Sequence, residues 1–335
     1  MPNRQWILTR RPAGRIDDGV LTLREAAVPE PAEGEALVRN LYLSLDPTHR
    51  IWMSDMDQYM PPVKLGEVMR GGTLGRVVAS RSSAFAPGDL VSTIGGYQDY
   101  CLATPATAST LAPAPGTPLV QYMGLLSHIG ATAWVGMLEI GKPKAGETVV
   151  VSGAAGAVGS LAAQLARHAG ARVIGIAGGR DKCAWLTGEL GLDAAIDYKH
   201  EDVRARLRAL APAGIDVYFD NTGGDILDAV LENLALFARI PLCGLISAYN
   251  AAEGWPGPRN YRNLLMKRAT VQGFIVSDHR PRFGEILPQL AALHAQGKLV
   301  YRVDVQAGLE HAPRYLNRLF DGENQGKLVV KIADE

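Results

Sequence analysis

A glycine-rich turn is the segment whose residue types and spacing point most directly to chemistry. It covers residues 153–159, GAAGAVG, between an apolar strand-like run and a helix-like run. Ala154, Gly156 and Gly159 occupy the three fixed places of the dinucleotide-binding pattern G-x-G-x-x-G/A, with alanine at the first. Gly156 would let the backbone approach a pyrophosphate, Gly159 would let the helix pack against the strand, and the helix N-terminus would meet the phosphates. Small residues at such a turn can also serve packing alone, so the strand–helix setting carries the prediction.

The second strand-like run ends without the acidic residue that an NAD site would use. It ends in Gly178 and Gly179, where an Asp or Glu about 20 residues beyond the glycine turn would bind the ribose 2′-hydroxyl. Arg180 and Lys182 follow at the start of a helix-like run. Cationic side chains and helix N–H groups together suit a 2′-phosphate, which favours NADP over NAD. Two alternatives remain: the cations are solvated surface charges, or Asp181 is a shifted ribose ligand.

The elements that must position these residues are indicated by an alternation of two kinds of run from about residue 121 onward. Strand-like runs cover residues 147–153, 171–179, 194–198, 214–224, 238–247 and 268–278. Helix-like runs cover residues 155–170, 181–191, 201–210, 225–234, 283–299 and 309–322. Such alternation is typical of βαβ units and of a parallel sheet with helices on both faces.

The segment up to about residue 112 has a different texture, because Gly and Pro interrupt short β-like runs. Examples are residues 35–46, 72–80 and 89–103. We predict a compact, mostly β domain here, followed by a linker at residues 110–118.

The composition limits the class of protein. The chain has 335 residues, 47% of them apolar, and 34 Lys and Arg residues balance 34 Asp and Glu residues. Zero net charge argues against a nucleic-acid binder that works through bulk charge. No apolar run approaches the roughly 20 residues of a membrane span, and the first residues show no apolar core of a signal peptide. We expect a cytoplasmic protein whose partners are neither nucleic acid nor membrane.

Metal-dependent and nucleophilic chemistries find no motif in the sequence. Cys101, Cys183 and Cys243 lie far apart and form no CxxC pair, which predicts reduced thiols rather than a disulfide framework. The seven histidines are scattered, whereas zinc needs clustered ligands at fixed spacing. The motifs G-x-S-x-G and H-E-x-x-H are absent from the sequence. We therefore predict no metal site, with hydride chemistry supplied by the cofactor.

Several motifs in one order resemble the zinc-independent medium-chain dehydrogenase/reductase superfamily. Within it, the chain is most similar to the leukotriene/prostaglandin reductase group and its bacterial NADPH-dependent curcumin/alkenal reductases. The motifs span nearly the whole chain and are YLSLDPTHR (42–50), YMPPVKLGEVMRGGTLGRVV (59–78), GAAGAVGS (153–160), GIAGGRDKCAWL (175–186), DVYFDNTGG (216–224), IPLCGLISAYN (240–250) and VQGFIV (271–276).

The resemblance implies an α/β fold, with a Rossmann-type doubly wound parallel sheet plus a mostly β, GroES-like catalytic domain. The catalytic domain would cover residues 1–125 and the NADP-binding domain residues 126–300. A return segment, residues 301–335, would complete the catalytic domain.

The resemblance also implies a set of cofactor-binding residues. Lys182 matches the lysine that holds the 2′-phosphate, with Tyr198 beside it, and Asn324 matches an asparagine of the return segment. The full set is Gly156, Ala157, Val158, Gly159, Gly178, Lys182, Tyr198, Asn221, Cys243, Gly244, Ile246, Ser247, Tyr249, Phe274, Ile275, Val276 and Asn324.

Tyr249 matches the proposed catalytic tyrosine of this group. When a hydride adds to the β-carbon of an α,β-unsaturated carbonyl compound, charge builds on the carbonyl oxygen. A phenol could stabilise that enolate or help to protonate it. The alternative is a turn tyrosine that packs on the cofactor. Tyr59 is expected either to border the substrate pocket or to cap the core as a loop tyrosine.

Two segments depart from the family pattern. Thr48 and His49 replace the Tyr and Met of its DPYMR motif, and residues 127–134 differ from its Met-Pro-Gly-x-Thr-Ala-Tyr stretch. Both segments lie near the cleft in relatives, so the departures bear on substrate preference more than on cofactor choice.

Taken together, the motifs predict an NADPH-dependent reductase of activated carbon–carbon double bonds that acts as a homodimer. Its substrate would be a small or medium hydrophobic enal, enone or quinone-like molecule. The alternatives are quinone or carbonyl reduction (or alcohol dehydrogenation) on the same scaffold, and a non-catalytic NADPH-binding protein.

Overall fold

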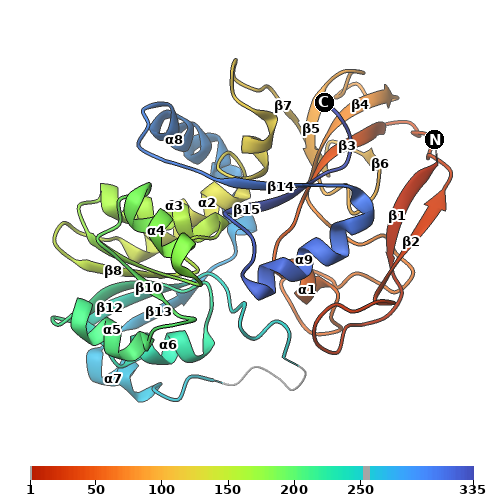
Figure 1. The fold of residues 1–335 in the computed structure, drawn as a ribbon. Helices are drawn as coiled ribbons and strands as arrows, with labels where there is room; N and C mark the ends of the chain where they lie inside the picture. The colour runs from red at the N-terminus through yellow and green to blue at the C-terminus, as the bar shows by residue number, and fades with distance from the viewer. Residues whose placement is uncertain (1, 252–256) are drawn as a thin grey trace. The chain divides into compact units, whose positions relative to one another are not determined.

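The computed structural model describes residues 2–251 and 257–335, and the chain divides into two compact units. The first unit comprises Met1–Met123, Val303–Asn324 and Leu328–Glu335, and the second comprises Gly124–Arg302 and Gln325–Lys327. The last part of the chain, blue in Figure 1, therefore contributes to both units.

The second unit is built on a six-stranded sheet in the order β10-β9-β8-β11-β12-β13. The strands are β8 (Thr148–Ser152), β9 (Arg172–Ala177), β10 (Ala194–Asp197), β11 (Ile215–Phe219), β12 (Leu234–Leu242) and β13 (Thr270–Gly273). Every neighbouring pair is parallel. Val149, Val150 and Val151 of the central strand are fully buried, as expected where helices cover both faces.

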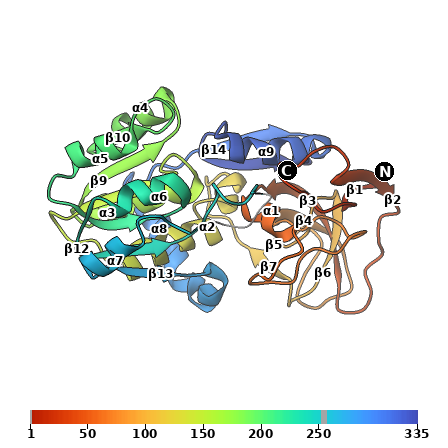
Figure 2. The same cartoon turned by 90° about the horizontal axis from the view of Figure 1, so that it is seen from below.

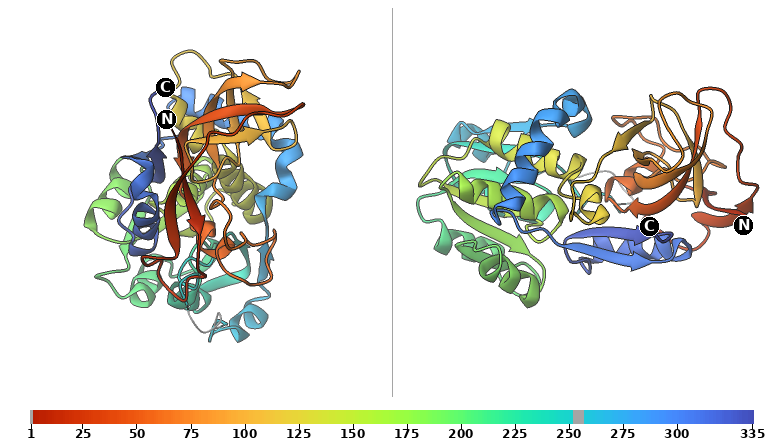
Figure 3. Two further views of the ribbon diagram at one scale, coloured as in Figure 1. Left: turned by 90° about the vertical axis from the view of Figure 1, so that its right-hand side faces the viewer. Right: turned by 90° about the horizontal axis from the view of Figure 1, so that it is seen from above.

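Helices pack on both faces of this sheet. They are α2 (His128–Trp134), α3 (Ala157–His168), α4 (Arg180–Gly188), α5 (Val203–Leu210), α6 (Gly224–Leu231), α7 (Arg262–Lys267) and α8 (Phe283–Ala295). Helix α2 packs on α3 and α8 above the sheet in Figure 1, whereas α5 packs on α6 below it. Figure 2 views the unit from the side of α6 and α7, and the right-hand view of Figure 3 looks onto α2 and α8.

The edge strand β13 is shorter than the sequence predicts. A single strand is expected over residues 268–278, but only Thr270–Gly273 pair with β12, and Val276–Arg282 form a 3₁₀ helix. The N–H of Asp278 donates to the carbonyl of Ile275 at 3.2 Å, which begins this turn. The apolar residues that follow Gly273 therefore do not extend the strand.

The first unit contains a seven-stranded sheet in the order β14-β15-β3-β4-β5-β7, with β6 also pairing with β3, and a separate β1–β2 pair. These strands are β1 (Asn3–Leu8), β2 (Leu21–Ala26), β3 (Ala36–Ser44), β4 (Thr73–Ser80), β5 (Leu90–Thr93), β6 (Tyr100–Ala103), β7 (Ala108–Leu111), β14 (Val303–Ala307) and β15 (Lys327–Lys331). Two helices accompany them, α1 (Thr48–Trp52) and α9 (Ala312–Asp321). Strand β15 pairs antiparallel with β3, so residues from both ends of the sequence form one sheet.

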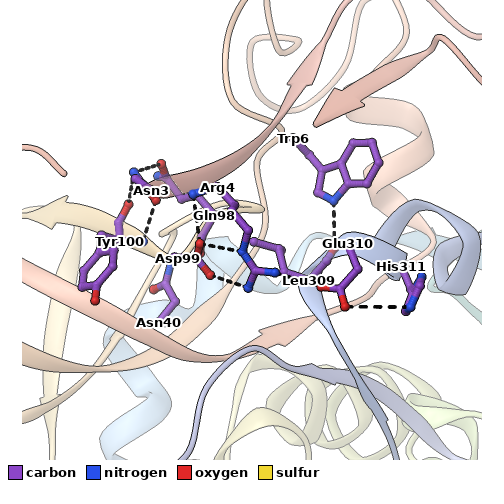
Figure 4. Close-up of polar contacts among 10 residues, drawn as sticks. All are labelled: Asn3, Arg4, Trp6, Asn40, Gln98, Asp99, Tyr100, Leu309, Glu310 and His311. Carbon is purple, nitrogen blue, oxygen red and sulfur yellow. Dashed lines mark hydrogen bonds and ion pairs between the residues drawn. The ribbon is translucent and has the colours of Figure 1, made fainter. Parts of the chain in front are cut away.

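Polar contacts also join the two ends of the sequence within the first unit (Figure 4). Arg4 binds Asp99 through two side-chain hydrogen bonds of 2.9 Å and pairs with Glu310 at 3.0 Å. The indole N–H of Trp6 donates to the carbonyl of Leu309 at 2.8 Å. The N-terminal strand is therefore tied to the segment just before α9.

None of the helices within residues 2–251 and 257–335 has the length and apolar character needed to cross a membrane.

Candidate cofactor site and active site

The carboxyl ends of the six parallel strands lie along one edge of the sheet in the second unit. Numbered from β8, the strand order is 3-2-1-4-5-6, the order of a dinucleotide-binding fold. Ligands of such sheets bind outside the carboxyl ends, where the strand order reverses. That point lies between β8 and β11 here.

The glycine turn after β8 is tightly packed on its inner side. A Cβ on Gly159 would lie 2.2 Å from the carbonyl oxygen of Gly153, so no larger residue fits there. Gly156 is the N-cap of α3, and no side chain caps the helix at that residue. The turn therefore presents backbone at the N-terminus of α3, the arrangement that binds a pyrophosphate.

The return segment reaches this turn, which the sequence did not predict. The N–H of Gly326 donates to the carbonyl of Ala155 at 3.2 Å, and Gly326 forms a parallel bridge with Gly156. Gly326 has a φ of 76°, and a Cβ there would lie 2.2 Å from the carbonyl oxygen of Arg302. Glycines are common in short polar loops, so the sequence does not mark Gly326 as special. Only its pairing with the glycine turn in the structure does.

The ends of β9 and β10 form the next part of the edge. After β9 comes Gly178, over which the side chains of Tyr198 and Lys199 fold: a Cβ on Gly178 would lie 2.9 Å from atoms of both. Arg180, which is exposed, and Lys182, which is half-buried, lie in the first turn of α4. With Lys199, three cationic residues thus follow the ends of β9 and β10, where an NAD enzyme carries an acid.

Asp197, which the sequence analysis did not single out, supports the same turn. Its carboxylate accepts hydrogen bonds from the N–H groups of Gly179 (2.7 Å) and Lys199 (3.1 Å) and pairs with His200 at 2.7 Å. Burial alone would raise the pKa of Asp197, but the donors, Gly179 and His200 foremost, hold it below its ordinary value. Asp197 stands at the end of β10, beside Ala177 of β9, and that adjacency is visible only once the strands are paired.

Asn221 follows β11 and is joined to the end of β8. Its side-chain amide donates to the carbonyl of Ser152 at 2.7 Å, and its backbone N–H donates to the Ser152 hydroxyl at 3.0 Å. The Cβ of Asn221 is 3.5 Å from where a Cβ of Gly153 would be. The structure therefore brings the Asn221 turn and the glycine turn together.

A buried carboxyl group shapes the turn that contains Asn221. One oxygen of Asp220 accepts hydrogen bonds from the Tyr218 hydroxyl (2.8 Å) and from the N–H groups of Thr222 (2.9 Å) and Gly223 (2.8 Å). Asp220 is fully buried, and burial raises its pKa although these donors oppose the shift. The carboxyl group thus holds the start of α6 in place.

The segment with Tyr249 is attached to the backbone of that same turn. Cys243 and Gly244 donate to the carbonyl of Asp220, at 2.9 and 3.1 Å. Further along, the Ser247 hydroxyl donates to the carbonyl of Thr222 at 2.6 Å. The Tyr249 hydroxyl accepts a hydrogen bond from the N–H of Leu245 at 3.1 Å. Burial raises the pKa of the Cys243 thiol to about 12, so this cysteine stays protonated.

The remaining predicted residues fall in two places. Phe274, Ile275 and Val276 follow β13 on the same edge, and the ring of Phe274 meets Phe219 edge-on at 6.5 Å. Asn324 belongs to the first unit, where it is buried.

Tyr59 also belongs to the first unit. Its hydroxyl lies 2.6 Å from the Thr48 hydroxyl and accepts a hydrogen bond from the Trp52 indole at 2.8 Å. Burial raises the pKa of Tyr59. Its side chain is thus held at α1 by two polar neighbours.

No three His, Cys, Asp or Glu side chains gather in an arrangement that could hold a metal ion in the described parts of the chain.

Comparison with known proteins gives two family matches. The family described as the N-terminal domain of oxidoreductase matches residues 4–111. The family described as zinc-binding dehydrogenase matches residues 157–292. Together these segments include strands β3 to β7 of the first unit and most of the second unit.

Characterised relatives match over the full length. The NADPH-dependent curcumin reductase of Escherichia coli (strain K12) is 41% identical, covering 99% of this chain and 98% of that protein. The 2-alkenal reductase (NADP(+)-dependent) of Nicotiana tabacum is 39% identical, covering 99% and 98%. The crystal structure of CurA from Vibrio vulnificus in complex with NADPH superposes with a TM-score of 0.94 at 42% identity, covering 99% of this chain and all of that one.

Proposed function

This chain belongs to the medium-chain dehydrogenase/reductase superfamily, and we propose that it reduces the carbon–carbon double bond of α,β-unsaturated aldehydes and ketones. It is an NADP-dependent oxidoreductase, and NADPH is its cofactor. The observation that carries the finer proposal is the continuous row of turns along the carboxyl edge of the sheet. Cations lie at its Gly178 end, and a tyrosine lies on the uncharged loop that follows β12.

The residues present fit NADPH. The glycine turn leaves the N-terminus of α3 without a side-chain cap, and the absence of a Cβ at Gly178 lets Tyr198 and Lys199 lie against the end of β9. Gly156–Gly159 would hold the pyrophosphate, and Lys182 with Tyr198 would hold the 2′-phosphate. Asn221, the 243–249 segment, Phe274–Val276 and Asn324 would contact the nicotinamide half.

The chemistry requires one donor near the substrate carbonyl. Bound NADPH supplies the hydride. The phenol of Tyr249 would donate a hydrogen bond to the carbonyl oxygen, where negative charge develops as the β-carbon is reduced. The hydrogen bond from the N–H of Leu245 to the phenol oxygen holds the Tyr249 hydroxyl at this loop. Tyr59 would border the apolar part of the substrate.

The test is a substrate screen that follows NADPH consumption at 340 nm in the presence of enals, enones, quinones and saturated ketones, with NADH run in parallel. Consumption with enals and enones, and none with saturated ketones, supports the proposal. Consumption with quinones or saturated ketones alone would assign a different reaction to the same scaffold. No consumption with any acceptor, despite NADPH binding, would indicate a non-catalytic binding protein.

We also propose that the protein is a homodimer formed through the edge of this sheet. All four residues of β13 are exposed, and within the described residues this strand pairs only with β12. Large exposed apolar side chains lie on β13 and on the neighbouring elements α7 and β12: Leu236, Phe237, Tyr261, Leu265, Met266 and Val271. An open, apolar strand edge invites pairing with another strand. Light scattering should give a dimer for the wild type and a monomer for Val271→Lys; a wild-type monomer would contradict the proposal.

A further inference from the structure

The side chain of Lys199 is aimed at the turn where a 2′-phosphate would bind. A Cβ on Gly178 would lie 2.9 Å from Cε of Lys199 and 2.9 Å from Cε1 and Cζ of Tyr198. Both side chains therefore fold back from the end of β10 over the end of β9. The ammonium group is one bond beyond Cε, so it lies close to Gly178 at the carboxyl end of β9.

The backbone of Lys199 is held in the position that makes this direction possible. Its N–H donates to Asp197, and the same carboxylate oxygen accepts from the N–H of Gly179. Tyr198 adds a backbone bond to the carbonyl of Ala177 at 3.1 Å. One buried carboxylate thus fixes two turns at once: the turn that begins α4 and the turn that carries Lys199.

The negative charge of Asp197 is already compensated. Its other oxygen pairs with His200 at 2.7 Å, and only 8% of the side chain is exposed to solvent. Glu201, the next acid along the chain, accepts from the N–H of Asp197 and pairs with Arg206 at 2.8 Å. Both acids thus face protein donors. Of the cations nearby, Arg180 and Lys199 are exposed and Lys182 is half-buried.

We propose that Lys199 is a second cationic determinant of NADPH selectivity beside Lys182, binding the 2′-phosphate from the end of β10 while Lys182 binds it from α4. This inference rests on the proposed use of NADPH and adds a residue to the site. An ammonium–phosphate contact is a charge-assisted hydrogen bond, which is stronger than a neutral one. A second cationic side chain on the phosphate also discriminates against NADH. NADH has no 2′-phosphate, so it gains nothing from this contact.

The test measures cofactor binding rather than turnover. Isothermal titration calorimetry on the cofactor-free protein gives Kd for NADPH, NADH, adenosine 2′,5′-bisphosphate and 5′-AMP. Lys199→Ala should weaken NADPH and the bisphosphate by about 10- to 100-fold, the range of one charged hydrogen bond, and change NADH and 5′-AMP by less than about twofold. Lys199→Arg should restore most of the loss.

The matched control is Lys144→Ala. Lys144 is an exposed lysine in the loop before the amino end of β8, on the opposite edge of the sheet; removing it should leave all four dissociation constants unchanged.

Equal losses for NADPH and NADH in Lys199→Ala, or no loss for either, would overturn the assignment of Lys199. A wild type that binds NADPH no better than NADH would instead contradict the proposed cofactor use itself. The two failures are therefore distinguishable in one set of titrations.

Discussion

Two turns on the carboxyl edge of the same sheet differ in charge and burial. Each is supported by one buried carboxyl group. At the β9–β10 end, Asp197 is held ionised by backbone N–H groups and a histidine, and the cationic residues Arg180, Lys182 and Lys199 lie close to it in sequence or across the strands. At the β11–β12 end, Asp220 is fully buried, its pKa is raised, and the segment it supports carries no charged side chain from Cys243 to Tyr249.

Under the proposed function, the difference follows from what each end would bind. A 2′-phosphate is a charged group at the surface, and surface cations with compensated acids suit it. A nicotinamide ring and a substrate carbonyl need a site with little water, where a single donor has a strong effect. Side-chain charge thus defines the first turn, and backbone hydrogen bonds define the second.

The most severe way to break the uncharged end is Asp220→Ala. It removes the acceptor of three close donors, the Tyr218 hydroxyl and the N–H groups of Thr222 and Gly223, and of the Ser152 hydroxyl at 3.4 Å. Because each orphaned buried donor costs about 1–3 kcal/mol, the free energy of unfolding should fall by roughly 3 kcal/mol or more. Urea denaturation measures this.

Asp220→Asn is the matched control, because an amide oxygen can still accept from the same three donors. Its loss should be less than half that of Asp220→Ala. Equal losses in the two variants would mean that the hydrogen-bond acceptor is not what holds the turn.

The next largest effect is expected on turnover, from Tyr249→Phe. If the phenol stabilises the developing enolate, kcat on an enone should fall by about 100-fold, at the low end of what a positioned proton donor contributes. Kd for NADPH should change little. The exposed Tyr261 serves as the control: Tyr261→Phe should leave kcat unchanged. An unchanged kcat in Tyr249→Phe would contradict the catalytic role of Tyr249. It would favour the alternative, a tyrosine that packs on the cofactor.

Two alanine substitutions in the glycine turn between the two ends can distinguish a role in packing from a role in cofactor binding. Gly159→Ala places a Cβ 2.2 Å from the carbonyl oxygen of Gly153 and should destabilise the protein by about 1–3 kcal/mol. In Gly156→Ala the nearest atom is 3.1 Å away, so stability should change less while NADPH binding weakens. Thermal unfolding measures the loss of stability in both variants, and calorimetry measures the loss of NADPH affinity. A larger stability loss in Gly156→Ala, with weaker NADPH binding only in Gly159→Ala, would contradict the assigned roles.

The smallest expected effect is on the pH dependence of stability, which compares the carboxyl groups of Asp197 and Asp220 directly. The pKa of Asp197 is lowered in the fold, so its contribution to stability is present above its unfolded pKa and is lost as the pH falls through the folded value. The pKa of Asp220 is raised, so its contribution is present below the unfolded pKa and is lost as the pH rises through the folded value.

Unfolding free energies of the wild type, Asp197→Asn and Asp220→Asn between pH 3 and 7 measure both signs. Relative to its Asn variant, the wild type should gain stability with rising pH at position 197 and lose it at position 220. The same sign at both positions would remove the contrast between the two turns.

The sequence predicts some residues of this edge and not others. Gly156, Gly159 and Lys182 could be identified because spacing along a single strand–turn–helix unit determines their places. Asp197, Lys199 and Asp220 could not, because their contacts depend on which strands become neighbours in the sheet. The same reason applies to Gly326, which meets the glycine turn from a segment about 170 residues away in sequence.

The alternating runs predicted the parallel sheet, and the structure confirms it with all five neighbouring pairs parallel. The length of β13 was not predictable, since the apolar residues Phe274–Val276 continue the strand pattern while the backbone turns away into the 3₁₀ helix.

The most direct measurement of the central claim is the position of the transferred hydride in the product. The enzyme would be incubated with 3-penten-2-one and NADPH deuterated in turn on each face of C4, and the product examined by NMR. The proposed function predicts 2-pentanone with one deuterium on the β-carbon from one of the two labelled cofactors. Deuterium on the carbinol carbon of 3-penten-2-ol would instead show carbonyl reduction and would contradict the assignment.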